Sequence, residues 1–259
     1  MTHILGMGEP LIEMVRVPKP VDGRPAYVQG FGGDTSTAII AAARQGARTG
    51  YISAVGGDMF GAALRALWTR EGVDHAHVLT REGDPTGVCF IDPDPAGRQF
   101  TYARRGSAAS LYQGEDVPGA AIARARVLHL SGISLAVSAR MRHAGLAAVR
   151  AAQESGTLVS YDLNHRPALW SVDDAVKTLT SMDKAPDIVF ASDDEAALLF
   201  GDTTPEAVAD RFLGRGAQIV VAKQGAKGAL LATENKRVPI PPAPSTPVDA
   251  SGALFEVSA

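Results

Sequence analysis

The sequence predicts an α/β fold in which a doubly wound, mostly parallel sheet carries helices on both faces. Short apolar runs alternate with longer stretches of helical periodicity, which is typical of βαβ units. Most of these runs are apolar nearly throughout, as expected for strands that are covered on both faces. A length of 259 residues allows one large domain over residues 1–259.

The positions of the predicted elements follow from these patterns. Strands are expected over residues 3–7, 50–55, 126–130, 158–163, 187–191 and 218–222. Helices are expected over residues 36–45, 58–70, 139–154 and 205–213.

Two segments, at about residues 16–31 and 86–105, break this alternation. The first contains the turn pair Asp22-Gly23, and the second contains a turn of Asp, Pro and Gly residues at 92–97. Around that second turn, residues 88–91 and 98–102 form a plausible hairpin. We expect these segments to form a small β lid over one end of the sheet. The alternative is that they are surface hairpins without a functional role.

Composition narrows the classes of partner. The formal net charge of −3 argues against nucleic acid, and no run approaches the roughly 18 apolar residues that span a bilayer. The single cysteine, Cys89, excludes an internal disulfide and fits a reducing cytoplasm. The N-terminus shows no export signal, so a cytoplasmic location is expected.

Two glycine-rich stretches each precede a predicted helix. In the stretch at residues 30–37, Asp34 or Thr35 is expected to cap the helix, and the glycines allow close approach to a ligand. In the stretch at residues 53–61, Asp58 is expected to cap the next helix. Taken singly, each stretch is also compatible with an ordinary turn.

The spacing of these two stretches resembles the N-terminal motif of the ribokinase, or carbohydrate kinase B, family. The segment 221–228, Val-Ala-Lys-Gln-Gly-Ala-Lys-Gly, is similar to the family's loop beside the nucleotide phosphates. The resemblance implies ATP and Mg²⁺ as cofactors. The residues implied to bind the nucleotide are Lys223, Gly225, Gly228 and Asp249.

The resemblance also implies that Glu195 holds the magnesium-bound phosphate. It lies where the family carries Asn-x-x-Glu, although Ser192 replaces the asparagine. Glu195 could equally be an acid in the first turn of a helix, where the macrodipole favours it.

Within the family, segments 8–12, 31–35, 130–136 and 162–170 most resemble the kinases of 2-keto-3-deoxygluconate, a sugar acid. The guanidinium of arginine presents a fork of donors that suits a carboxylate. By resemblance, the substrate would be bound by Gly33, Asp34, Tyr102, Arg104, Asn164 and Arg166. The alternative for Arg104 and Arg105 is a solvated pair at a hairpin end.

The end of the chain departs from the family pattern Asp-Thr-x-Gly-Ala-Gly-Asp. Asp249, Gly252 and Ala253 match it, but the terminal Gly-Asp does not follow. We therefore expect Gly252 and Ala253 to retain part of an anion hole, the catalytic aspartate to be absent, and the C-terminal part of the usual domain to be missing. Truncation or omitted residues are favoured over a naturally inactive relative, because the residues on the substrate side are intact.

The expected function is ATP-dependent phosphorylation of 2-keto-3-deoxygluconate to its 6-phosphate. The alternatives are a kinase for a neutral sugar, such as fructose or ribose, and an inactive relative that binds a sugar acid. The resemblance further implies a homodimer formed through the lid, with a small sugar acid and a nucleotide as ligands and neither nucleic acid nor membrane as a partner.

Overall fold

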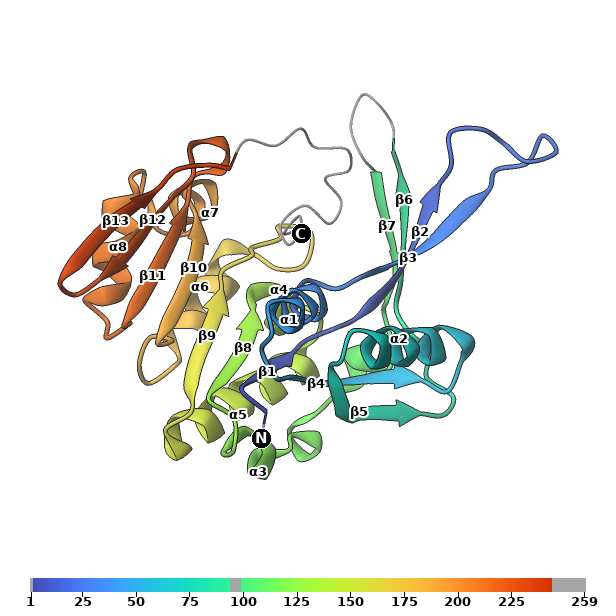
Figure 1. The fold of residues 1–259 in the computed structure, drawn as a ribbon, viewed down its shortest axis with the longest axis horizontal. Coiled ribbons are helices and arrows are strands. Elements are labelled where there is room, and N and C mark those ends of the chain that lie inside the picture. Colours follow the sequence, from blue (N-terminus) through green and yellow to red (C-terminus); the bar gives the residue numbers. More distant parts are fainter. Residues whose placement is uncertain (1, 94–98, 244–259) are drawn as a thin grey trace.

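A computed structural model describes residues 2–93 and 99–243, which form a large sheet, its covering helices and a smaller sheet (Figure 1). The large sheet has nine strands in the order β13-β12-β11-β10-β9-β8-β1-β4-β5. In chain order, these strands are β1 (Ile4–Met7), β4 (Thr49–Gly56), β5 (Asp74–Arg81), β8 (Val127–Ser131), β9 (Leu158–Asp162), β10 (Ile188–Ser192), β11 (Ile219–Lys223), β12 (Ala229–Thr233) and β13 (Lys236–Ile240).

The helices lie between the strands, as the predicted alternation requires. The α-helices are α1 (Asp34–Arg44), α2 (Met59–Arg70), α3 (Gly119–Ile122), α4 (Gly132–Ala136), α5 (Ala139–Ser155), α6 (Val172–Thr180), α7 (Asp193–Phe200) and α8 (Pro205–Leu213). Three short 3₁₀ turns are η1 (Ala109–Leu111), η2 (Gly114–Asp116) and η3 (Gly225–Lys227). In the described part of the chain, no helix is both long and apolar enough to cross a membrane.

Pairing is parallel from β11 to β5, and only the β12 and β13 edge is antiparallel. From β1 the chain builds outward through β4 and β5 on one side and then through β8 to β11 on the other. The strand order therefore reverses beside β1. In open α/β sheets, the crevice at the carboxyl ends of the strands next to such a reversal is where ligands bind.

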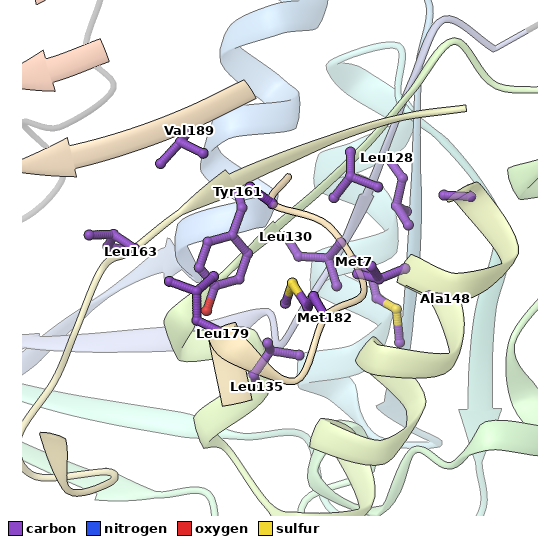
Figure 2. Packing of buried hydrophobic residues seen from close by; sticks show 14 of the residues in the cluster. Met7, Leu128, Leu130, Leu135, Ala148, Tyr161, Leu163, Leu179, Met182 and Val189 are labelled. Atoms are coloured by element: carbon purple, nitrogen blue, oxygen red, sulfur yellow. The ribbon is translucent and has the colours of Figure 1, made fainter. Parts of the chain in front are cut away.

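Apolar side chains cover both faces of the sheet. Along β4, Ile52 and Ala54 belong to the larger core cluster, whereas Tyr51 and Val55 belong to a second cluster with α1 and α2. Successive side chains of a strand point to opposite faces, so this division identifies β4 as a strand buried on both sides. Figure 2 shows part of the larger cluster, in which residues of β1, β8 and β9 pack against α5 and α6.

The smaller sheet, hereafter the lid, consists of β2 (Leu11–Arg16), β3 (Tyr27–Gly32), β6 (Val88–Asp92) and β7 (Gln99–Ala103) in the order β3-β2-β6-β7. It extends away from the carboxyl edge of β1 (Figure 1). The predicted hairpin around the second turn is present, because β6 and β7 pair in antiparallel register. The first lid strand starts at Leu11, five residues before the predicted segment, and part of that segment is a turn with Asp22 and Gly23 at positive φ.

The six predicted core strands and four predicted helices are confirmed to within a few residues. The prediction that Asp34 or Thr35 caps α1 is wrong: Gly33 occupies the N-cap position, and no side chain caps the helix. The predicted cap of α2 is correct, since the Asp58 carboxylate accepts a hydrogen bond of 2.7 Å from the Gly61 N–H. Strands β5 and β13 were not predicted, because their exposed residues interrupt the apolar runs. Strand β12 was also missed, although its run is apolar and it has no exposed residue.

Gly132, the first residue of α4, provides a test of this packing. A Cβ atom there would overlap the carbonyl oxygen of Leu163, in the segment that follows β9. We expect Gly132→Ala to lower the free energy of unfolding by about 1–3 kcal/mol, because a backbone must move to admit the methyl group. Urea unfolding measures this change. Gly119→Ala, where no atom lies within 4 Å of the added Cβ, should stay within about 1 kcal/mol of the wild type. Equal stability of the two variants would contradict the described contact.

Candidate ligand-binding cavity

A cavity of about 910 Å³ lies at the carboxyl edge of the large sheet, between the start of α1 and the lid. All six residues predicted to bind the substrate line it: Gly33, Asp34, Tyr102, Arg104, Asn164 and Arg166. They come from three separate parts of the chain, which the reversal of strand order beside β1 brings together. The cavity therefore occupies the position that the topology favours for a ligand.

Gly33 and Asp34 form the junction between lid strand β3 and helix α1. Gly33 has φ 100°, and a Cβ there would overlap the backbone of Glu9 and Pro10, so this junction requires glycine. One carboxylate oxygen of Asp34, Oδ2, accepts a hydrogen bond of 3.1 Å from the Asn164 Nδ2 group. The other oxygen, Oδ1, is buried and has no hydrogen-bond partner among the described residues. A buried acceptor of this kind suits a ligand hydroxyl.

Asn164 and Arg166 lie in the segment after β9. Asn164 adopts φ 32°, a conformation that asparagine tolerates better than most residues. The segment is anchored by Trp170, whose ring stacks on His165 at 6.4 Å and lies 5.2 Å from the Arg142 guanidinium of α5. These contacts of Trp170 hold the segment against α5. The Arg166 side chain remains 44% exposed, so its guanidinium is available to a ligand.

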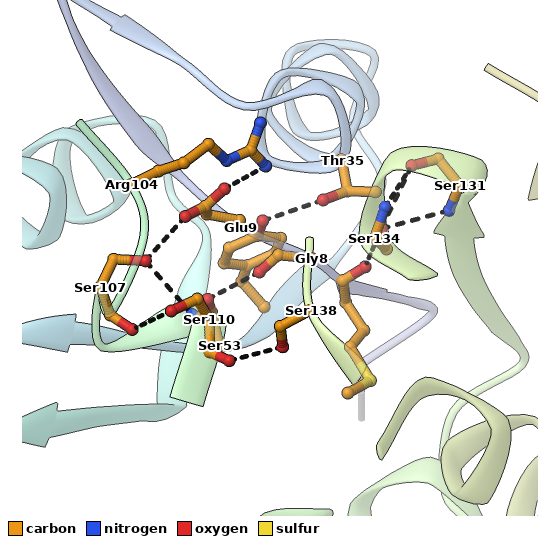
Figure 3. Close-up of polar contacts among 12 residues, drawn as sticks. Gly8, Glu9, Thr35, Ser53, Arg104, Ser107, Ser110, Ser131, Ser134 and Ser138 are labelled. Atoms are coloured by element: carbon orange, nitrogen blue, oxygen red, sulfur yellow. Dashed lines mark hydrogen bonds and ion pairs between the residues drawn. The ribbon is translucent and has the colours of Figure 1, made fainter. Parts of the chain in front are cut away.

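Arg104 follows lid strand β7 and is already paired. Its guanidinium forms an ion pair with the carboxylate of Glu9 (Figure 3). The same guanidinium lies 5.3 Å from the centre of the Tyr102 ring. The Arg104 side chain is 12% exposed, which excludes the alternative of a solvated Arg104–Arg105 pair for Arg104. Arg105 is exposed and does not line the cavity.

Glu9 lies where β1 passes into lid strand β2, and its side chain is fully buried. The Ser107 hydroxyl donates a hydrogen bond of 2.8 Å to Glu9 Oε1. Further hydrogen bonds connect Ser107 through Ser110 to Ser138, the N-cap of α5 (Figure 3). Burial raises the pKa of Glu9 above its ordinary value, although Arg104 and Ser107 oppose the rise.

A second group of polar residues lies along the same edge, at the ends of β9 to β11. Lys223 Nζ donates hydrogen bonds of 3.0 and 2.8 Å to the two carboxylate oxygens of Asp162. Gly225 and Gly228, which follow β11, both have positive φ. Asp249, Gly252 and Ala253 lie outside the described residues.

Glu195 is the only predicted metal ligand. It forms a capping box with Ser192 at the start of α7, and its carboxylate lies 3.7 Å from Arg166. No cluster of three or more metal-ligating side chains occurs within residues 2–93 and 99–243. A single carboxylate still fits Mg²⁺, because this ion commonly takes one or two protein carboxylates, with phosphate and water oxygens completing its shell.

Three site residues were missed from the sequence: Glu9, Ser107 and Asp162. Glu9 and Asp162 lie inside segments that we had singled out, Glu9 just after one predicted strand and Asp162 near the end of another. An acidic residue at the carboxyl end of a predicted parallel strand is the signal that could have found both. Ser107 had no such signal, because its role depends on the loop that returns from the lid.

Comparisons with known proteins identify the family of the chain. Residues 1–253 match the family model described as pfkB family carbohydrate kinase. A 2-dehydro-3-deoxygluconokinase from Thermoproteus tenax is 32% identical over 88% of this chain and 71% of its own length. The corresponding enzyme from Bacillus subtilis is 34% identical over 80% of this chain. The match covers 65% of that enzyme's own length, just under two thirds. Fructokinase-1 from rice, Oryza sativa subsp. japonica, is 32% identical over 96% of this chain and 79% of its own length.

Solved structures share the fold. The PfkB protein from Polaromonas sp. JS666 superposes with a TM-score of 0.88 at 31% identity, covering 94% of this chain and 84% of that one. A candidate ribokinase II from E. coli, in complex with ATP and Mg²⁺, superposes with a TM-score of 0.87 at 26% identity, covering 98% and 82%. The chain belongs to the pfkB family of carbohydrate kinases.

The thiol of Cys89, which lines the cavity on lid strand β6, gives a direct test of the lid's packing. Burial raises its pKa to about 11, so roughly one thiol in a thousand is ionised at pH 8. We expect native protein to react with Ellman's reagent at least about a hundredfold more slowly than unfolded protein, which should yield one thiol per chain. Rapid labelling of the native protein would contradict the described environment of Cys89.

Proposed function

We propose that this protein transfers the γ-phosphoryl group of ATP to the 6-hydroxyl of 2-keto-3-deoxygluconate. The observation that carries the proposal is the convergence of Arg104 and Arg166 on a cavity that also contains the unpartnered oxygen of Asp34. A sugar acid presents both a carboxylate and hydroxyl groups, and these are the groups that such side chains bind. The relatives named 2-dehydro-3-deoxygluconokinase, a synonym of 2-keto-3-deoxygluconate kinase, support the same substrate.

In this proposal the residues of the chain mainly bind and orient. Arg166 holds the substrate carboxylate, while Asp34 accepts a hydrogen bond from a sugar hydroxyl and is itself oriented by Asn164. Tyr102 and Arg104 close the cavity from the lid. Phosphoryl transfer forms a P–O bond to the 6-hydroxyl, breaks the bond between the β- and γ-phosphates, and releases the hydroxyl proton. Such reactions depend chiefly on positioning and charge stabilisation.

Lys223, Gly225 and Gly228 would hold the nucleotide along their edge of the sheet, and Glu195 would hold the Mg²⁺ ion. The complex of the E. coli relative with ATP and Mg²⁺ supports both cofactors. Bound Mg²⁺ supplies positive charge that stabilises the transferring phosphoryl group. Asp249 would contribute to the nucleotide site, and Gly252 and Ala253 to an anion hole, as their match to the family motif implies.

A kinase for a neutral sugar is the second candidate. The pairing of Arg104 with Glu9 favours it, because a neutralised guanidinium attracts a carboxylate less strongly. The similarity to rice fructokinase-1 also supports it.

A homodimer formed through the lid and a cytoplasmic location remain part of the proposal. An inactive relative that binds a sugar acid is the third candidate, and it predicts binding of the acid without turnover.

Arg166→Ala tests the substrate assignment. We expect the dissociation constant for 2-keto-3-deoxygluconate to rise by about 10- to 100-fold, because charge-assisted hydrogen bonds to the carboxylate are lost. The dissociation constant for fructose should change by less than about threefold, since fructose has no carboxylate. Calorimetric titration measures both, and a coupled assay for ADP formation measures turnover.

Arg105→Ala is the matched control, because Arg105 is an exposed arginine next to Arg104 that does not line the cavity. It should leave both dissociation constants unchanged. If Arg166→Ala left binding of the sugar acid unchanged, or if the wild type bound fructose and not the sugar acid, the substrate assignment would be wrong.

A further inference from the structure

We propose that Glu9 sets the preference of the cavity for acid over neutral sugars, by fixing the position of Arg104 while cancelling its charge. This inference rests on the proposed function, because it concerns the sugar site of that reaction. Sequence similarity to both sugar-acid and neutral-sugar kinases leaves the preference open. The contacts of Glu9 suggest how one buried carboxylate adjusts it.

The first step is positional. The Glu9 side chain is fully buried and is held on one side by the Ser107 hydroxyl and on the other by Arg104. Ser107 is itself held by Ser110, whose N–H lies 3.2 Å from the Ser107 Oγ atom. A neighbouring backbone restricts the space further, since a Cβ on Gly87 would lie 3.0 Å from Glu9 Oε1. Glu9 therefore has little freedom, and it fixes the guanidinium that it contacts.

The second step concerns charge. Four arginines line the cavity, Arg44, Arg70, Arg104 and Arg166. The proposed function assigns Arg104 and Arg166 to the sugar site, and Glu9 neutralises the first of these two. Asp34 adds a negative charge to the same cavity. A carboxylate ligand would then be attracted mainly by Arg166, while the charge of Glu9 repels it. A neutral sugar experiences no such repulsion. Ionised Glu9 therefore lowers the affinity of the cavity for the sugar acid relative to its affinity for a neutral sugar.

The third step is that substitution can separate position from charge. Glutamine has nearly the same shape as glutamate, so its carbonyl oxygen can still accept from Arg104 while its amide faces Ser107. Glu9→Gln should keep Arg104 in place and restore its attraction for an anion. Alanine removes both the charge and the support, so Glu9→Ala should displace Arg104 and weaken binding of the acid. A purely structural role would weaken binding in both variants.

Protonation of Glu9 should act like the glutamine substitution. The titratable and charged groups around it are Asp34 and Tyr51 on the core side, Arg104 after β7, and Glu13, Cys89 and Tyr102 on the lid. Burial raises the pKa of Glu9, so a larger share of it is neutral at mildly acidic pH than for an exposed glutamate. Binding of the sugar acid should therefore tighten as the pH falls.

The experiment is calorimetric titration of the full chain with 2-keto-3-deoxygluconate and with fructose. The wild type, Glu9→Gln and Glu9→Ala are compared. The matched control is Asp116→Asn, which alters a partly buried carboxylate that is also paired with an arginine, Arg81, away from the cavity. We expect Glu9→Gln to shift the ratio of the two dissociation constants toward the acid by about tenfold, as a charge removed at short range in a partly buried site would.

Glu9→Ala should shift the ratio away from the acid, and Asp116→Asn should leave it unchanged. As the pH rises through the raised pKa of Glu9, the affinity of the wild type for the acid should fall, whereas that of Glu9→Gln should show a smaller change. The inference is overturned if the ratio is the same in the wild type and Glu9→Gln, or if glutamine and alanine weaken acid binding alike.

Failure of the proposed function has a different signature. It would appear in the wild type alone, as a preference for fructose over the acid. Even then, Glu9→Gln must gain affinity for the acid relative to fructose for the inference to stand, because the argument concerns the direction of the change.

Discussion

The site depends on one buried ion pair, between Glu9 and Arg104, where the core meets the lid. The chain passes between the two sheets at four places: from β1 into β2, from β3 into α1, from β5 into β6, and from β7 back to the core. Glu9 lies at the first crossing, its carbonyl packs against Gly33 at the second, its carboxylate lies beside Gly87 at the third, and the same carboxylate binds Arg104 and Ser107 at the fourth. A buried charge must be paired to be tolerated, so the contacts of Glu9 link all four crossings.

The position of the lid relative to the core follows from these crossings, and with it the cavity. Side chains from the lid, from the start of α1 and from the end of β9 line one cavity. They meet because the lid, the start of α1 and the end of β9 all lie at the carboxyl edge of the large sheet. The anchoring of Trp170 against α5 then directs Arg166 into the same space. Rigid elements thus hold the polar groups of the site, an arrangement that favours selective binding.

Sequence patterns were sufficient for the parts of this arrangement that are local. Apolar periodicity identified the core strands and the longer helices. The family resemblance pointed to six residues that line the cavity, of which Gly33, Asp34, Asn164 and Arg166 lie inside the motif segments. The pairing of Arg104 with Glu9 could not be predicted, because the two residues are 95 positions apart and meet only through the crossings. The hydrogen bond between Lys223 and Asp162 could not be predicted for the same reason, because it joins β11 to β9 across the intervening strand β10. The start of α1 was mispredicted because the positive φ of Gly33 sets the helix boundary, not a side-chain cap.

The central claim is that the Arg166 guanidinium, after the end of β9, receives the acid group of a sugar in a cavity that Arg104 and Tyr102 close from the lid. A crystal structure of the protein with bound 2-keto-3-deoxygluconate tests it most directly. The account predicts the ligand carboxylate within hydrogen-bond distance of Arg166, with a sugar hydroxyl on the free oxygen of Asp34. A carboxylate directed toward solvent or toward α2, with Arg166 uninvolved, would contradict it.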